Sequence, residues 1–140
     1  MAQMVFKYVD ENRLLGGGPA GLYFAISMKL RDASHDITVI ERNRADDTFG
    51  WGVVLSDETL ANLKNNDPVS AEAIQKFFAY WDDIALVHRG ERLVSSGHGF
   101  CGIGRRKLLE LLQERAVALG VKLEFETEID DIEALCDQHD

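Results

Sequence analysis

Two kinds of apolar spacing alternate along the chain. In residues 21–32 the apolar positions are almost continuous from Leu22 to Ile26, which predicts a helix whose first turns are buried on most sides. The next apolar run, residues 37–40, is short and rich in β-branched side chains, as is typical of a buried parallel strand. Helical and strand spacing in alternation predict an α/β fold, with a parallel sheet flanked by helices.

The clearest helical pattern covers residues 105–120, and a strand pattern follows it. Gly120 stands where a left-handed C-cap belongs. Residues 121–128 alternate between apolar and charged side chains, which predicts a strand with one solvent-exposed face. The predicted helix has one apolar face, made of Leu108, Leu111, Leu112, Ala116 and Leu119.

Two shorter helices and a hairpin are predicted in the middle of the chain. Ser56 is a candidate N-cap for a helix over residues 56–66, because acidic side chains follow it in the first turn. Residues 67–81 begin with Asp-Pro, which is typical of an N-cap and first helical position, so a second helix is expected there. Residues 83–97 predict two strands joined at the turn "RGE", which makes a β-hairpin.

The length and composition exclude several classes of protein. The chain has 140 residues, 46% of them hydrophobic, which suffices for the core of one domain. Its formal net charge is −9, and its densest basic run, residues 105–107, is too short for a nucleic-acid surface. It has no apolar membrane span and no secretion-signal pattern. Cys101 and Cys136 match no metal-site spacing and are expected to be reduced thiols of a cytoplasmic protein.

The stretch "GGGPAG" carries the candidate chemistry. Gly16, Gly18 and Gly21 fit the pattern G-x-G-x-x-G directly before a predicted helix. In such a turn the first glycine permits the tight bend, the second lets the backbone approach a pyrophosphate, and the third lets the helix pack closely on the strand. The helix start would offer free N–H groups and a positive dipole end to the phosphates.

An acidic residue at the end of the second predicted strand completes this pattern. Glu41 lies 20 positions beyond Gly21, where a carboxylate can accept hydrogen bonds from both ribose hydroxyls of an adenosine. The strand expected before the glycines, residues 11–15, fits poorly, because burying the charges of Glu11 and Arg13 in a central strand would be costly. The glycines and Glu41 together predict a dinucleotide site.

Five motifs occur in an order and spacing that resemble one enzyme family: "GGGPAGL", "ERN", "FGWGVV", "GHGF" and "GRRKLL". From about Leu14 onward the sequence resembles the flavin-dependent aromatic hydroxylases related to p-hydroxybenzoate hydroxylase. Within them it is most similar to the salicyloyl-CoA and anthraniloyl-CoA hydroxylases. The resemblance implies a Rossmann-like FAD-binding domain, FAD as cofactor, NAD(P)H as transient electron donor, and a small aromatic substrate such as an aromatic acyl-CoA.

The same resemblance implies the site residues, position by position. The three motif glycines and the two residues between the second and third would hold the FAD pyrophosphate. Glu41 would bind the adenosine ribose, Arg42 would lie against the adenine, and Arg105 would reach back to the FAD from the start of its helix. The residues so assigned are Gly16, Gly18, Pro19, Ala20, Gly21, Glu41, Arg42 and Arg105.

The resemblance extends to the flavin end of the cofactor, with less definite roles. Residues 49–53 would bring their backbone close to the isoalloxazine ring, since the glycines among them permit a close approach. Trp51 fits either this role or that of a core aromatic residue. His98 is expected near the flavin as a hydrogen-bonded structural residue rather than a catalytic one. No catalytic residue and no metal ligand is named.

The chain also departs from the family pattern. Residues 1–13 do not resemble the family's opening strand, and the Asp-Gly motif, the substrate-covering sheet and the Gly-Asp motif do not occur. We therefore expect residues 1–140 to be the N-terminal part of an incomplete FAD-binding domain, with residues 1–13 as an atypical leader, no substrate domain, and no activity alone. Two alternatives stay open: a non-catalytic module that holds an adenine dinucleotide, and a remnant that binds no ligand.

Overall fold

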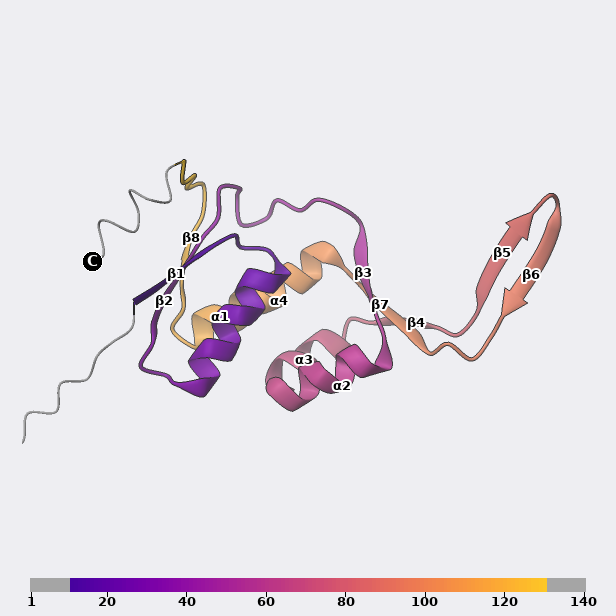
Figure 1. Ribbon diagram of the computed structural model, residues 1–140, viewed down its shortest axis with the longest axis horizontal. Helices are drawn as coiled ribbons and strands as arrows, with labels where there is room; N and C mark the ends of the chain where they lie inside the picture. The colour runs from indigo at the N-terminus through magenta and orange to yellow at the C-terminus, as the bar shows by residue number, and fades with distance from the viewer. Residues whose placement is uncertain (1–10, 131–140) are drawn as a thin grey trace, which may run out of the picture. The chain divides into compact units, whose positions relative to one another are not determined.

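The computed structural model describes residues 11–130 (Figure 1). The chain divides into two compact units, which are described one at a time. Within the described part, the first unit contains residues 11–47 and 112–130, and the second contains residues 48–111. Parallel strands alternate with helices in the first unit, and the second combines antiparallel strands with helices. This arrangement confirms the predicted α/β class, parallel sheet and hairpin.

The first unit is built on a parallel sheet. Its strands are, in spatial order, β1 (Glu11–Leu15), β2 (Asp36–Ile40) and β8 (Lys122–Glu124). Leu15 pairs with Ile40 and Ile40 with Glu124, so the carboxyl ends of all the strands meet at one edge. Residues 37–40 are buried at the centre of this sheet, as their apolar run predicts.

β1 forms despite the charges that make it a poor strand by sequence. Because side chains alternate across a strand, Leu14 points to one face of the sheet and Arg13 to the other. Arg13 lies beside Thr38, on the face where Lys122 Nζ binds Asp36 Oδ2 at 2.9 Å. This face is polar, and β1 is an edge strand of the described sheet, so Arg13 is only half-buried. Residues 1–10 of the predicted leader lie outside the described residues.

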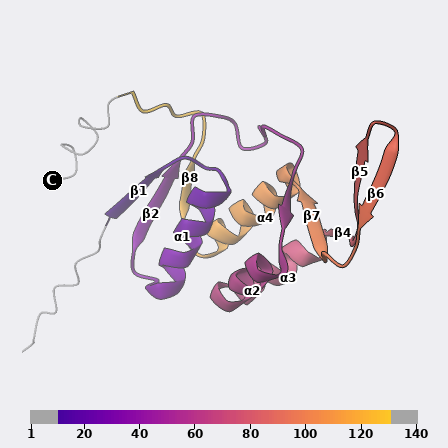
Figure 2. The same cartoon turned by 45° about the vertical axis from the view of Figure 1, so that its right-hand side comes forward.

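The helix after the glycine turn, α1 (Pro19–Arg31), packs against β1 and β2. Leu22, Ala25 and Ile26 are fully buried, and their spacing places them on one side of the helix. Phe24 is 54% exposed, so the prediction of burial on most sides is wrong. A residue two positions after Leu22 points to the opposite side of the helix, away from the sheet. Figure 2 shows α1 beside the strands of this unit.

The helix α4 (Arg105–Ala118) contributes its last turns to the first unit. Leu112 and Ala116, on the predicted apolar face, are buried there. Gly120 has φ +84°, and its N–H donates a hydrogen bond to the carbonyl oxygen of Val117 at 2.9 Å. The predicted left-handed C-cap is therefore confirmed. β8 follows this cap, but it is shorter than the predicted strand.

The sheet of the second unit is antiparallel. Its strands are, in spatial order, β3 (Gly52–Leu55), β7 (Phe100–Gly104) and β4 (Ala79–Trp81). The apolar spacing predicts neither β3 nor β7, because β3 has only three apolar residues after Gly52 and glycine interrupts β7. The predicted helix over residues 67–81 is wrong in its last part, because the helix ends at Gln75 and residues 79–81 form β4. Aromatic side chains favour such a strand position, and β4 pairs with β7.

Two capped helices belong to the second unit, α2 (Asp57–Asn66) and α3 (Pro68–Gln75). The hydroxyl oxygen of Ser56 accepts a hydrogen bond from the N–H of Thr59 at 3.3 Å. The buried carboxylate of Asp67 accepts another from the backbone at the start of α3. Both predicted N-caps are therefore confirmed.

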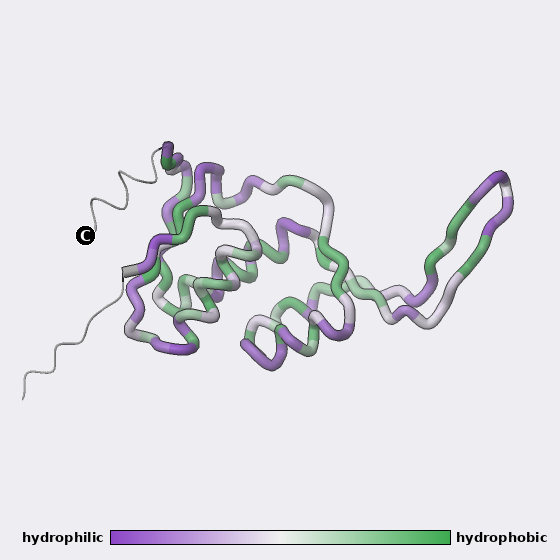
Figure 3. The backbone as a smooth tube through the Cα atoms, viewed as in Figure 1, coloured by the Kyte–Doolittle hydropathy of each residue, from purple (hydrophilic) through white to green (hydrophobic). Residues whose placement is uncertain are grey.

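The predicted hairpin is formed by β5 (Ile84–His88) and β6 (Glu91–Ser95). Arg89 and Gly90 connect the strands with φ +50° and +82°, as a two-residue hairpin turn requires. All residues of both strands are exposed, and Figure 3 shows hydrophobic positions along each. None of the helices between residues 11 and 130 combines the length and apolarity needed to cross a membrane.

Candidate nucleotide-binding site

The candidate site begins at the turn that connects β1 to α1 in the first unit. β1 ends at Leu15, and the N–H of Gly16 still donates to the carbonyl oxygen of Ile40 at 2.8 Å. Gly16 then takes φ +116°, a conformation that L side chains rarely adopt. The first motif glycine thus turns the chain out of the sheet at the carboxyl edge, where α/β sheets bind ligands.

The other two motif glycines meet opposite demands. A Cβ on Gly21 would overlap the carbonyl oxygen of Gly16, so the helix can lie this close to the turn only with glycine. At Gly18 a Cβ would meet nothing within 4 Å, because this backbone faces open space. Gly21 is therefore needed for packing within the protein, whereas Gly18 leaves room for a group that approaches from outside.

The start of α1 is suited to an anion. Gly18 is the N-cap with extended backbone, and no side chain among the described residues caps the helix. Pro19 occupies the first helical position, and the first turn contains no acidic residue. The N–H groups that follow at Ala20 and Gly21 stand at the positive end of the helix dipole. A negatively charged group is stabilised in this position.

Glu41 lies directly after β2, next to the glycine turn. Its Oε2 accepts a hydrogen bond from the backbone N–H of Gly17 at 2.8 Å. Its Oε1 accepts two from Asn43, one from the backbone N–H at 2.8 Å and one from the side-chain amide at 2.7 Å. Burial alone would raise the pKa of Glu41, but these hydrogen bonds and the charge of Arg42 outweigh it and hold the pKa below its ordinary value of 4.5. The carboxylate is therefore ionised at neutral pH.

A cavity of about 220 Å³ opens beside Glu41, entirely within the first unit. It lies at the carboxyl edge of the sheet, and its size suits one part of a larger ligand. Arg42 stands at its rim, with Nη1 3.7 Å from the Glu128 carboxylate; both side chains are well exposed. The lining residues are Leu15, Gly16, Ile40, Glu41, Arg42, Thr127, Glu128 and Ile129.

Arg105 belongs to the second unit, at the first position of α4. Its N–H donates to the carbonyl oxygen of Trp51 at 3.2 Å, and its side chain passes beside Gly50. Its Nε is buried and has no hydrogen-bond partner among the described residues. A buried guanidinium donor without a partner is costly, so this atom is suited to an acceptor from a ligand.

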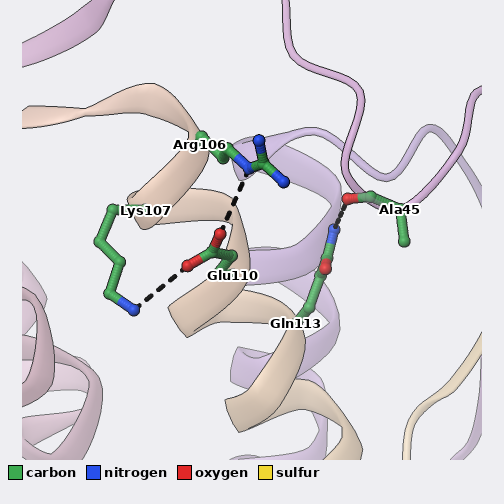
Figure 4. A network of polar contacts seen from close by, with 5 residues as sticks. All are labelled: Ala45, Arg106, Lys107, Glu110 and Gln113. Atoms are coloured by element: carbon green, nitrogen blue, oxygen red, sulfur yellow. Dashed lines mark hydrogen bonds and ion pairs between the residues drawn. The ribbon is translucent and has the colours of Figure 1, made fainter.

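The basic neighbours of Arg105 are engaged differently. Arg106 and Lys107 both pair with Glu110, at 3.4 Å and 3.1 Å (Figure 4). Further along α4, in the first unit, the Gln113 side-chain amide donates to the carbonyl oxygen of Ala45 at 3.0 Å. These contacts stabilise the helix and its surroundings, and they leave Arg105 as the residue of the basic run with a candidate ligand role.

Two residues with open roles are also placed in the second unit. The Trp51 side chain is fully exposed, so it is not a core aromatic residue. The exposed His98 ring lies 2.7 Å from the Ser95 hydroxyl through Nε2 and stacks on Phe100 at 5.3 Å between centroids. These contacts favour the expected structural role of His98. Cys101 is a buried free thiol, and Cys136 lies outside the described residues.

Sequence reasoning missed several residues of the site. Gly17 is the variable position of the glycine pattern, yet it binds Glu41 directly. Asn43 is visible only as the last letter of the "ERN" motif, which carries no chemical meaning before the contacts are known. Residues 127–129 come from the segment after β8, and only the folded sheet brings them to the cavity.

Known proteins similar in sequence to this chain include hydroxylases and monooxygenases. A salicyloyl-CoA 5-hydroxylase from a Streptomyces species is 47% identical over 117 residues, which cover 84% of this chain and 23% of that protein. A 3-hydroxy-4-methyl-anthranilyl-(aryl-carrier protein) 5-monooxygenase from Streptosporangium sibiricum is 33% identical over 110 residues, which cover 78% of this chain and 31% of that protein. No protein-family model matches the chain.

Solved structures share the fold. A p-nitrophenol 4-monooxygenase from Pseudomonas putida DLL-E4 matches 89% of this chain and 34% of its own, with a TM-score of 0.76 and 18% identity. The chain thus spans about a quarter to a third of the length of the proteins that it matches. It is homologous to hydroxylases and monooxygenases of aromatic substrates, and the resemblance inferred from its motifs is confirmed.

Proposed function

We propose that this chain forms the FAD-binding part of a flavin-dependent monooxygenase that hydroxylates an aromatic ring. The observation that carries the proposal is the juxtaposition of the glycine turn, the uncapped start of α1 and the ionised Glu41 carboxylate. A cavity opens beside the turn and Glu41 at one edge of the parallel sheet. Homology to aromatic hydroxylases makes FAD the dinucleotide that best fits this arrangement.

The residues of the first unit would each take one part of the cofactor. The pyrophosphate would lie against Gly16 and Gly18 and accept hydrogen bonds from the N–H groups at the start of α1, after Pro19. Gly21 would let the helix stay close to the turn. Glu41 would accept a hydrogen bond from a ribose hydroxyl.

The adenine would occupy the rest of the same cavity. Its plane would lie against Arg42, whose guanidinium can stack on an aromatic ring. The ion pair with Glu128 would hold that guanidinium at the rim. Ala20 would supply backbone N–H on the pyrophosphate side rather than a side-chain contact.

Two features of the second unit, taken by itself, suit a flavin cofactor. Arg105 would offer its buried Nε, which has no hydrogen-bond partner among the described residues, to an acceptor of the FAD. The exposed backbone around Gly50 and Gly52 would permit the close approach of a flat ring. When bound, FAD supplies the redox chemistry that introduces oxygen into the substrate, while the protein binds and orients it.

The finer assignments extend this proposal. We infer a small aromatic substrate held as a thioester, because the names of two relatives specify CoA and aryl-carrier-protein substrates. NAD(P)H would supply the electrons in a cytoplasmic protein. We expect hydroxylation to require a protein as long as the relatives. This chain alone is therefore expected to bind FAD without catalysing the reaction.

A second candidate function is a non-catalytic module that holds an adenine dinucleotide. The glycine turn and Glu41 would serve NAD as well as FAD, because both contain adenosine and a pyrophosphate. The buried Nε of Arg105, which lacks a hydrogen-bond partner within residues 11–130, favours FAD, because a module that only holds a nucleotide has no use for such a donor. Affinities for FAD and NAD measured side by side distinguish the two candidates.

The proposal is tested by titration of the purified chain with FAD, followed by gel filtration and a visible spectrum. We expect bound flavin to co-elute with the chain, and Glu41→Ala to weaken binding at least about tenfold, as loss of a hydrogen bond to a charged group does. Glu114→Ala, which removes the same charge from an exposed position of α4, is the matched control and should bind normally. A folded chain that retains no flavin would refute the proposal.

A further inference from the structure

We propose that Asn43 is the positioning residue of this nucleotide site: it holds the Glu41 carboxylate in the orientation that receives the ribose. The inference rests on the proposed function, and it adds a residue that neither the glycine pattern nor the acidic position of such sites includes. Asn43 follows β2 in the chain and reaches back to Glu41 through two donors.

The contacts leave the carboxylate little freedom. Both donors of Asn43 end on Oε1, at 2.8 Å from the backbone nitrogen and 2.7 Å from the amide nitrogen. Gly17 fixes Oε2 from the opposite side at 2.8 Å. A carboxylate offers about four acceptor positions. With three of them taken, the free position lies on Oε2, where a ribose hydroxyl can donate.

Asn43 is also joined to the segment after β8, part of which lines the cavity. Its carbonyl oxygen accepts a hydrogen bond from the N–H of Glu126 at 3.1 Å. The next residue, Thr127, donates its N–H to the carbonyl oxygen of Glu41 at 3.1 Å and lines the cavity. One side chain and its backbone thus connect the acidic residue to the segment that encloses the nucleoside.

The amide is the chemical group that this role requires. An aspartate at position 43 would have the same shape, but it would lose the donor and place a second negative charge beside Glu41. An alanine would lose the side-chain donor and keep the backbone one. If Asn43 served only the turn, Asn43→Asp would bind FAD more tightly than Asn43→Ala, because aspartate also supports such turns. If Asn43 holds the carboxylate, Asn43→Ala binds FAD more tightly than Asn43→Asp.

The charges around Glu41 determine how the variants respond to pH. Arg42 attracts its carboxylate, and Glu128 partly neutralises Arg42 through their ion pair. Glu124 and Glu126 belong to the segment from β8 onward, and α1 adds no charged side chain to the cavity lining. Removing the Asn43 amide therefore raises the pKa of Glu41. FAD binding needs the ionised form of Glu41. On acidification, the variant therefore loses FAD at a higher pH than wild type does.

The experiment compares the FAD affinity of the wild-type chain with those of Asn43→Ala, Asn43→Asp and the control Asn65→Ala between pH 4 and 8. We expect about tenfold weaker binding for Asn43→Ala, a larger loss for Asn43→Asp, and an acid limit shifted to higher pH in the alanine variant. Asn65, exposed on α2, should behave as wild type. The inference would be overturned if Asn43→Asp bound FAD more tightly than Asn43→Ala, or if Asn43→Ala lost FAD at the same acid pH as wild type.

The titration of Glu41 in the FAD-free chain separates this inference from the proposed function. It is followed by NMR of the carboxyl carbon in chains labelled with ¹³C-glutamate. If wild type binds no FAD, the proposed function fails, and the inference is decided by this measurement alone. A raised Glu41 pKa in Asn43→Ala supports the positioning role, and an unchanged one refutes it.

Discussion

The backbone N–H of Gly17 and the carboxylate of Glu41 are joined by a hydrogen bond of 2.8 Å, and the two residues are in close contact. A Cβ added to Gly17 would stand 2.9 Å from the Cβ of Glu41 and 3.2 Å from its Cγ. Glu41 and the glycine turn therefore form one packed structure, although 24 positions separate Gly17 from Glu41. The middle glycine of "GGG" is required by Glu41 rather than by the turn.

Gly17→Ala is expected to displace Glu41. The new methyl group meets the rigid base of the side chain, so either the carboxylate or the turn must move. We expect unfolding to become easier by about 1–3 kcal/mol, as in other overpacked sites, together with weaker FAD binding. Urea unfolding and FAD titration measure the two effects. Unchanged values in both would show that the contact is not as close as described.

Gly18→Ala is expected to separate binding from stability. Gly18 has φ −73° and faces open space, so alanine fits the folded chain and costs at most about 1 kcal/mol as an N-cap. The same methyl group would stand where a pyrophosphate approaches the backbone, so FAD affinity should fall at least about tenfold. Urea unfolding and FAD titration again measure the two effects. If the variant binds FAD as tightly as wild type, the pyrophosphate does not lie against Gly18.

Glu41 should make the stability of the chain depend on pH in acid. Its pKa is lowered in the folded state, so its contribution is fully present above the ordinary value of 4.5. That contribution is lost as the pH falls from 4.5 through the folded pKa. Glu41→Gln lacks this titration, so the difference in unfolding free energy between wild type and variant should shrink below pH 4.5. Parallel curves for the two proteins would contradict the assignment.

Cys101 should react slowly with thiol reagents. Burial and the nearby negative charge of Asp57 raise the pKa of its thiol, and the thiolate is the reactive form. In a Cys136→Ser background, we expect labelling of Cys101 by a disulfide reagent to be much slower than that of a free cysteine, and to accelerate above pH 9. Rapid labelling at pH 7 in the folded chain would show that the thiol is accessible.

Much of the secondary structure follows from local chemistry. The buried run 37–40 becomes the central strand β2, and the apolar face that includes Leu112 and Ala116 becomes the buried side of α4. Ser56 and Gly120 act as caps because their side chain or backbone freedom meets a need of the adjacent helix end. These elements are predictable because each depends on neighbours a few positions away.

The sequence misleads where the partner of an element is distant. β4 interrupts a helical pattern because its residues pair with β7. β1 accommodates Arg13 because this residue lies on a polar face at the sheet edge. Local spacing contains neither fact. Both depend on which strand lies alongside, and that is decided by the packing of the whole unit.

By itself, the sequence determined the α/β class, the glycine turn, the acid at position 41 and the likeness to aromatic hydroxylases. Only the tertiary structure decided that Gly17 and Asn43 hold this acid, that residues 127–129 complete its cavity, and that the buried Nε of Arg105 finds no partner in the described part of the chain. The reason is physical. A motif records the demands of backbone conformation and charge along the chain, whereas hydrogen bonds between segments depend on positions that the chain acquires only by folding.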